Sequence, residues 1–163
     1  MMALLAACVG VSHSGGTGED SSGGGSLAGT AWEVTAYNNG EQTLVSVPGG
    51  MRITANFGED GRVTGSAGCN RYFASYEASD EIITIGMPGA TRRLCAEPKG
   101  IMDQEAFYLA ALKSAARFRL EGDRLELRTK EEALAVSLVR MPSGASVPDA
   151  SATSASHVEF SRR

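Results

Sequence analysis

The central part of the sequence lacks histidine, and the chain has neither a long apolar run nor a block of basic residues. Its two histidines, His13 and His157, lie in flanks rich in glycine, serine and alanine. The centre therefore has neither the usual general base of enzymes nor the commonest nitrogen ligand of metals. No apolar run approaches the length of a helix that spans a bilayer. With a formal net charge of −4 and no basic cluster, the chain lacks the electrostatic footprint of a nucleic-acid-binding protein.

The motifs of two common enzyme classes are also missing. The sequence contains no Gly-x-Ser-x-Gly nucleophile elbow. Its Gly23-Gly24-Gly25 run precedes a predicted strand and is not followed by Gly-Lys-Ser/Thr, so it is not a phosphate-binding loop. We therefore expect a protein that is not an enzyme, that uses no metal or other cofactor, and that has no nucleic acid partner.

The N-terminal segment Leu5-Ala6-Ala7-Cys8 resembles a bacterial lipobox, in which Cys8 becomes the lipid-modified first residue of an exported lipoprotein. Only seven residues precede Cys8, whereas a signal peptide has a basic start and a longer apolar stretch. Either the true start lies upstream, or the match is accidental and the segment is an ordinary disordered N-terminus. The following Gly/Ser run is typical of a flexible tether. We expect a signal remnant at 1–8, a flexible tether at 9–26, one domain at 27–140 and a disordered tail at 141–163.

Short segments with strand character, separated by turns, fill most of the predicted domain. Apolar residues recur at helical spacing only between Ile101 and Ala116, and residues 41–50 are expected to form a loop. A single late helix argues against a βαβ architecture. We predict the α+β class: a single small domain with a curved, barrel-like antiparallel sheet of about seven strands, packed with one α-helix. Strand character is found at residues 30–37, 52–57, 62–65, 72–76, 81–85, 118–120, 125–127 and 134–138.

Glu105 falls in the middle of the apolar face of the predicted helix. A buried carboxylate needs a cation, hydrogen-bond donors or a proton. The candidate cations near the central cysteines are Arg71, Arg92 and Arg93. Glu105 is then either a ligand-binding or acid/base group, or a clamp that pins the helix to the Gly68-Cys69-Asn70-Arg71 stretch. A helix rotated slightly from the ideal position would instead expose it.

Cys69 and Cys95 are the only cysteines of the predicted domain and lie 26 positions apart. In an oxidising compartment they would pair, and closing such a loop stabilises a fold by roughly 3 to 4 kcal/mol. Two buried free thiols are the alternative. Redox chemistry is less well supported because the Cys-x-x-Cys spacing is missing, and two sulfurs without histidine leave a zinc ion short of ligands.

Most aromatic residues of the predicted domain are expected in its core. Phe107 differs, because it falls on the polar side of the predicted helix with Asp103 and Ser114. An exposed aromatic side chain contributes to a contact surface. The alternative is that a loop, such as residues 41–50, covers it.

Several segments occur together in an order and spacing that resemble a known family. They are Leu27 to Trp32, Phe57 with Asp60 to Gly65, Gly68 to Tyr72, Thr91 to Cys95, the helix that carries Glu105, and Leu125-Glu126-Leu127. In this arrangement the chain is similar to the META domain family, to which the heat-shock protein HslJ belongs. The resemblance implies a small antiparallel sheet with one helix, and an envelope or secreted setting, often in lipoproteins. It also implies links to heat shock, novobiocin resistance, motility and virulence, but no catalytic mechanism. The recurrent family residues correspond here to Trp32, Gly65, Gly68, Cys69, Asn70, Thr91, Cys95 and Glu105.

These observations lead to one principal functional hypothesis and two alternatives. We expect an exported, lipid-anchored and monomeric envelope protein that binds another envelope component or supports envelope integrity under stress. The membrane is contacted only through the lipid on Cys8. The first alternative is a small-ligand binding module with a pocket near Glu105, and the second is a thiol redox protein using Cys69 and Cys95. The candidate binding residues are Asn70, Arg71, Glu105 and Phe107.

Overall fold

The computed structural model describes residues 25–41 and 43–142. Cys8, most of the predicted tether and nearly all of the predicted tail lie outside these residues. The expectations for those segments therefore stay predictions. Within the described part of the chain, no helix is long and apolar enough to cross a membrane.

The described chain forms ten strands and one helix. In chain order they are β1 (Thr30–Asn38), β2 (Leu44–Ser46), β3 (Thr54–Phe57), β4 (Arg62–Ser66), β5 (Arg71–Ser79), β6 (Ile82–Ile85), β7 (Gly89–Ala90), α1 (Ile101–Lys113), β8 (Arg117–Glu121), β9 (Arg124–Arg128) and β10 (Leu134–Arg140).

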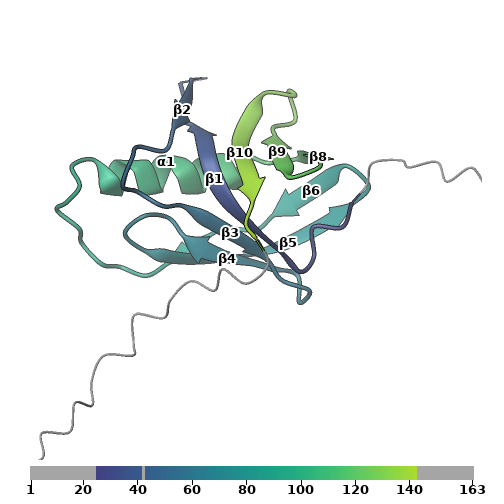
Figure 1. Cartoon of the computed structure of the whole chain (residues 1–163), viewed down its shortest axis with the longest axis horizontal. Helices are drawn as coiled ribbons and strands as arrows, with labels where there is room; N and C mark the ends of the chain where they lie inside the picture. The colour runs from purple at the N-terminus through teal and green to yellow at the C-terminus, as the bar shows by residue number, and fades with distance from the viewer. Residues whose placement is uncertain (1–24, 42, 143–163) are drawn as a thin grey trace, which may run out of the picture.

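Eight of the strands close into an antiparallel barrel (Figure 1). Neighbours follow the order β1-β3-β4-β5-β6-β8-β9-β10, and β10 pairs with β1 to complete the circle. Register pairs such as Trp32 with Ala55 and Val34 with Leu138 place buried side chains opposite one another. The predicted α+β class, with a barrel-like antiparallel sheet and one helix, is confirmed.

Two short strands extend this barrel and were not expected from the sequence. β2 runs beside the second half of β1, where Tyr37 pairs with Val45. It lies inside residues 41–50, expected to form a loop, although the turn at Pro48 does form, with Met51 N–H donating to the Pro48 carbonyl at 3.1 Å. β7 continues beside β5 after β6 has left it. Strands of three and two residues are too short to show an alternating pattern.

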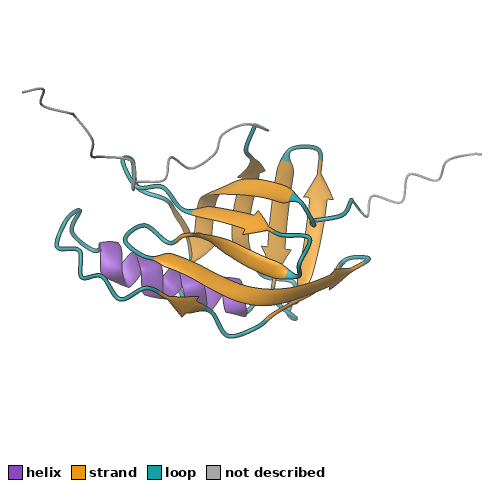
Figure 2. Ribbon diagram, turned by 90° about the horizontal axis from the view of Figure 1, so that it is seen from below, coloured by secondary structure: helices purple, strands orange, loops and turns teal. Residues whose placement is uncertain are grey.

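The helix α1 begins at Ile101 and ends at Lys113, earlier than the predicted end at Ala116. It starts directly after Gly100, which has a φ of 83°. At the other end the Ala116 N–H donates to the Arg128 carbonyl at 2.8 Å, so the chain has already joined the sheet there. Figure 2 shows α1 lying against the strands of the barrel. Its buried face includes Tyr108 and Leu112.

Aliphatic and aromatic side chains fill the space between the barrel and α1. Every aromatic side chain of the described residues is buried except Phe73 and Phe107. The ring of Tyr108 meets those of Tyr37 and Tyr72 edge-on, with centroids 6.4 and 5.5 Å apart. The helix is thus fixed by aromatic packing against two different strands.

The hydroxyl groups of Tyr72 and Tyr108 form a buried chain of hydrogen bonds. Tyr72 Oη donates to the Thr54 carbonyl at 3.0 Å, so it accepts from Tyr108 Oη, which lies 2.7 Å away. Burial raises the pKa of both phenols well above the ordinary value, because a phenolate at either position would lose its hydration. Both hydroxyls are therefore neutral at physiological pH and act as structural hydrogen-bonding groups.

Candidate functional site

The turn between β4 and β5 carries the Gly68-Cys69-Asn70 sequence and faces the first turns of α1. The N–H of Ala67 donates to the Asn70 carbonyl at 2.8 Å and closes the turn. Gly68 has a φ of 113°, and a Cβ atom there would lie 2.8 Å from Nε2 of Gln104. The backbone conformation therefore favours glycine, and a larger residue would also displace the end of the Gln104 side chain.

Glu105 is buried at the base of this turn and is held entirely by Asn70. Its side chain has a relative exposure of 7%. Oε2 accepts a hydrogen bond from the Asn70 backbone N–H at 2.8 Å, and Oε1 accepts one from Asn70 Nδ2 at 2.8 Å. This two-point contact joins α1 to the turn, in the manner expected of a clamp.

Glu105 forms no ion pair with any of the three candidate arginines in the described part of the chain. Arg71, Arg92 and Arg93 are exposed, and none of them makes an ion pair within residues 25–41 and 43–142. On β5 the side chain of Arg71 alternates with that of Tyr72, which points into the barrel, so the guanidinium lies on the outer face. Of the three partners that the sequence left open for a buried carboxylate, hydrogen-bond donors are the ones found, because the N–H groups of Asn70 occupy both carboxylate oxygens.

Asn70 also ties the segment before α1 to the barrel. Its Oδ1 accepts hydrogen bonds from Thr91 Oγ1 and from the Arg93 N–H, both at 2.8 Å. Its Nδ2 donates a second bond, to the Arg93 carbonyl at 3.1 Å. Both ends of the amide are thus engaged, which also fixes the orientation of the amide.

A disulfide joins Cys69 and Cys95 across the same junction. The expected pairing is thereby confirmed, and the alternative of two free thiols does not match the structure. We call the set Cys69, Asn70, Thr91, Cys95 and Glu105 the lock, because it joins the β4–β5 turn, the segment before α1 and the helix. One buried polar atom beside it, Oε1 of Gln104, has no hydrogen-bond partner among the described residues.

Phe107 lies on the opposite side of α1 from Glu105, as a separation of two residues on a helix requires. Its relative exposure is 45%, so residues 41–50 do not cover it. It lines a groove of about 730 Å³ together with Leu44, Ala110 and Leu134. Val45 and Pro48 border a smaller hollow of about 220 Å³, which Phe107 also lines. We call the larger space the Phe107 groove.

Most aromatic residues were expected in the core, and Phe73 is one of the two that are exposed. Its relative exposure of 57% places it on the outer face of β5, beside a second hollow. The strand alternation contains the signal that finds it: Tyr72, Ala74 and Tyr76 point inward, so Phe73 must point outward.

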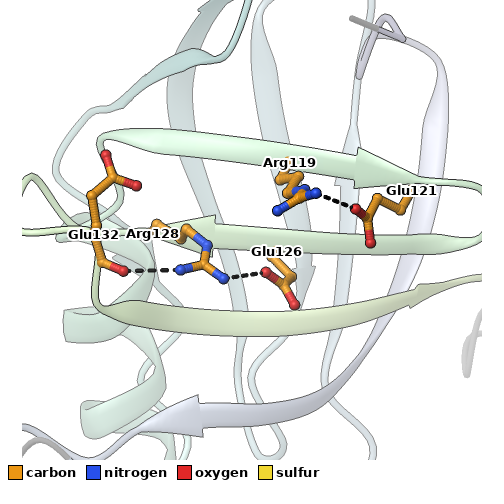
Figure 3. A network of polar contacts seen from close by, with 5 residues as sticks. All are labelled: Arg119, Glu121, Glu126, Arg128 and Glu132. Atoms are coloured by element: carbon orange, nitrogen blue, oxygen red, sulfur yellow. Dashed lines mark hydrogen bonds and ion pairs between the residues drawn. The ribbon is translucent and has the colours of Figure 1, made fainter. Parts of the chain in front are cut away.

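The outer surface also carries paired charges on β8 and β9 (Figure 3). Arg119 lies 2.6 Å from Glu121, and Arg128 lies 2.6 Å from Glu126. Arg128 also donates to the Glu132 carbonyl at 3.0 Å. The Arg119–Glu121 pair is exposed, and exposed pairs add little stability, whereas the Arg128–Glu126 pair is half-buried. They do neutralise the arginines on this part of the barrel.

The model of the META domain matches residues 25–141, which cover the whole barrel and the helix. The chain belongs to the META domain family. Comparison with curated proteins finds no significant match. The META domain described here is similar to the NMR structure of a protein from Burkholderia xenovorans, with 28% sequence identity and a TM-score of 0.58, covering 71% of this chain and 84% of that one. A second NMR structure shares the fold with 23% identity and a TM-score of 0.50, covering 69% of this chain and 90% of that one.

The lock of this META domain consists of residues that recur in the family. Cys69, Asn70, Thr91, Cys95 and Glu105, which the resemblance identified as recurrent positions, are brought together in space. Of the candidate binding residues, Asn70 and Glu105 are in contact with each other. The side chains of Arg71 and Phe107 lie on separate surfaces.

Proposed function

We propose that this META domain is a non-enzymatic binding domain of the bacterial cell envelope. In this proposal a lipid on Cys8 holds the protein at the membrane, and the domain contacts another envelope protein through the Phe107 groove. The contact helps to preserve the envelope under stress, a role that the family resemblance implies.

The observation that carries the proposal is that the reactive groups of the lock are all engaged within the protein. The two sulfurs are bonded to each other, and both oxygens of Glu105 accept hydrogen bonds from Asn70. A nucleophile or a general base needs a free atom within reach of a substrate. The lock therefore supports a structural role, and the exposed surfaces become the candidates for function.

The Phe107 groove has a volume of about 730 Å³, and its chemistry fits an apolar segment of a protein. Apolar side chains come from three parts of the fold: Leu44 from β2, Phe107 from α1 and Leu134 from β10. Glu131 is the charged side chain on its border. A partner that inserts aliphatic or aromatic side chains would bury these residues and gain hydrophobic stabilisation.

The first alternative, a small-ligand pocket near Glu105, has less support. Within the described residues, Glu105 lines neither the Phe107 groove nor four other hollows of about 550, 210, 480 and 220 Å³. Its carboxylate is directed at Asn70, below the surface. A ligand that used this group would first have to displace two hydrogen bonds.

Photo-crosslinking in living cells tests the proposed contact directly. A photoreactive phenylalanine analogue replaces Phe107 in the full chain, and the same analogue replaces Ile82 in a control. Ile82 is an exposed apolar residue of β6 and does not line the groove. We expect a discrete crosslinked protein in the envelope fraction from position 107 and none from position 82.

Two further readouts make the result decisive. Phe107→Ser should weaken binding of the captured protein by about tenfold or more in a purified system, because central aromatic contacts carry much of the affinity of an interface. Ile82→Ser should leave that affinity unchanged. The proposal fails if position 107 gives no discrete product, or the same products as position 82, while the protein is present in the envelope.

A further inference from the structure

A hollow of about 550 Å³ opens on the outer face of the barrel over β3, β4 and β5. Asn56 of β3 pairs with Thr64 of β4, but the regular pairing of the two strands does not continue from there toward Thr54 and Ser66. There the Ser66 N–H donates to the side-chain oxygen of Thr54 at 3.1 Å. Gly65 permits this geometry, since a Cβ atom would lie 1.9 Å from the Thr54 carbonyl oxygen. The hollow therefore lies where the regular pairing of β3 with β4 is interrupted.

Phe73 supplies an apolar wall to this hollow. Its ring rests on Gly89 of β7, where a Cβ atom would lie 2.8 Å from Cζ of the ring. One side of the ring is thus supported by the neighbouring strand, while more than half of the side chain is exposed. A supported, exposed aromatic ring offers a flat apolar surface of the kind that packs against the C–H face of a sugar ring.

Polar side chains without partners lie in the same row. Register places Asn56, Thr64 and Phe73 side by side on neighbouring strands. Within the chain as described, the amide of Asn56 and the hydroxyl of Thr64 make no hydrogen bond, and both line the hollow. An amide and a hydroxyl each donate and accept, which suits the hydroxyl groups of a saccharide. A few polar groups beside an apolar wall are typical of a ligand site.

The charged side chain that lines the hollow is basic. Arg71 lines it, and no acidic side chain does. The Thr91 N–H donates to the Arg71 carbonyl at 2.9 Å. Arg92 and Arg93 follow Thr91 directly, so two more arginines are close to Arg71 along the backbone. A guanidinium group binds a carboxylate through two parallel hydrogen bonds. The side chains around the hollow thus combine an aromatic wall, neutral polar groups and a free guanidinium.

We infer that this hollow is a binding site for an acidic saccharide, a sugar ring that carries a carboxylate. The ring packs on Phe73, its hydroxyl groups bond to Asn56 and Thr64, and its carboxylate pairs with Arg71. The site shares no residue with the Phe107 groove, so it does not depend on the function proposed above.

Calorimetric titration of the full chain with two trisaccharides tests this inference. Trigalacturonate is the acidic probe and maltotriose is the neutral one. We expect saturable binding of trigalacturonate, at least about fivefold tighter than that of maltotriose. Arg71→Gln should weaken trigalacturonate binding by about tenfold and leave maltotriose binding unchanged, because a charge-assisted hydrogen bond is lost.

Two variants test the aromatic wall. Phe73→Ala should weaken both saccharides by a similar factor. Gly89→Ala should do the same while the fold persists, because the added methyl group displaces only the end of the Phe73 ring. Amide spectra of each variant, compared with those of the unaltered protein, report whether the barrel is intact.

Matched controls alter the same residue types elsewhere. Phe107→Ala removes an exposed phenylalanine outside the hollow, and Arg124→Gln removes an exposed arginine of β9. Both should bind trigalacturonate normally. The inference is overturned if neither saccharide binds saturably at millimolar concentration, or if the controls weaken binding as much as Arg71→Gln and Phe73→Ala. It is also overturned if citrate, an acid without a sugar ring, binds as tightly as trigalacturonate.

Discussion

At the scale of single residues, Asn70 carries most of the connections in the lock. Its backbone N–H and its side-chain amide both donate to Glu105, while its side-chain oxygen accepts from Thr91 and Arg93. The amide cannot be turned over without placing its NH2 group against two other donors. This arrangement fixes what a partner at position 105 must offer, namely two acceptors.

Glu105→Gln tests that requirement. The NH2 group of glutamine would face either the Asn70 N–H or its amide NH2, so one hydrogen bond would be replaced by two opposed donors. We expect the free energy of unfolding to fall by roughly 1.5 to 3 kcal/mol in urea denaturation. Glu77→Gln, the same change at an exposed position of β5, should alter it by less than about 0.5 kcal/mol. Equal stability of the two variants would show that Glu105 is not a clamp.

The buried phenols predict a loss of stability at alkaline pH. Folding raises the pKa of Tyr72 and Tyr108 above the unfolded value of about 10, so the native state keeps protons that the unfolded state releases. Their contribution is complete below about pH 10 and falls as the pH rises further. In a titration followed by phenolate absorbance, Tyr37 and Tyr76 should ionise first, and Tyr72 and Tyr108 only as the protein unfolds. Ionisation of all four tyrosines in the folded state would contradict this.

The sequence indicated part of this residue-scale picture. The helical wheel correctly placed Glu105 on the buried face, because the spacing of apolar residues along a helix shows which side faces the core. It could not identify the partner, since Asn70 lies 35 positions away and any of several nearby groups had suitable chemistry. The arginines could be named as candidate cations, whereas the hydrogen-bond donors could not be assigned to a particular residue. Strand alternation in β5 could have shown that Arg71 and Phe73 share the outer face.

At the scale of elements, the β4–β5 turn and α1 depend on each other. Gly68 lies so close to Gln104 and Ile101 that an added Cβ would displace the end of the Gln104 side chain, and its φ of 113° disfavours a side chain independently. The long strands and the helix were predictable because each shows a clear period. β2 and β7 were not predictable, since these short strands form only by pairing with β1 and β5.

Gly68→Ala tests the dependence between these two elements. We expect a loss of about 2 kcal/mol or more in the free energy of unfolding, from backbone strain and displacement of the Gln104 side chain. Gly49→Ala is the matched control, because nothing lies within 4 Å of its Cβ position and its φ is outside the left-handed region. That variant should change the free energy by about 0.5 kcal/mol or less. If both variants unfold at the same urea concentration, the close approach of α1 does not constrain the turn.

At the scale of the whole molecule, the lock has a structural role, and the two open surfaces are the candidate binding sites. The lock holds the helix to the barrel, the Phe107 groove is proposed to bind a protein, and the hollow beside Phe73 is proposed to bind a saccharide. The fold class was predictable from the order of strands and one late helix. Neither hollow was predictable from the sequence, because each is formed by elements that meet only in the folded barrel.

The proposed lipid anchor makes a prediction for the complete chain. Cys8→Ser should move the protein from the membrane fraction to the soluble fraction and abolish incorporation of radiolabelled palmitate. Barrel stability should be unchanged, since residue 8 lies outside the matched domain. A wild-type protein that incorporates no palmitate and stays soluble would rule out the anchor, whatever the Phe107 groove binds.

The central claim, that the lock holds the fold together and does not react, is tested most directly by the state of its two cysteines. The full chain, exported to an oxidising compartment, is treated with iodoacetamide in its folded state, with and without mild reductant, and the modified residues are mapped by mass spectrometry. We predict that Cys69 and Cys95 stay unmodified in both samples and react only after unfolding and reduction. Modification of both cysteines in the folded protein without reductant, or after mild reduction with the fold intact, would contradict the account.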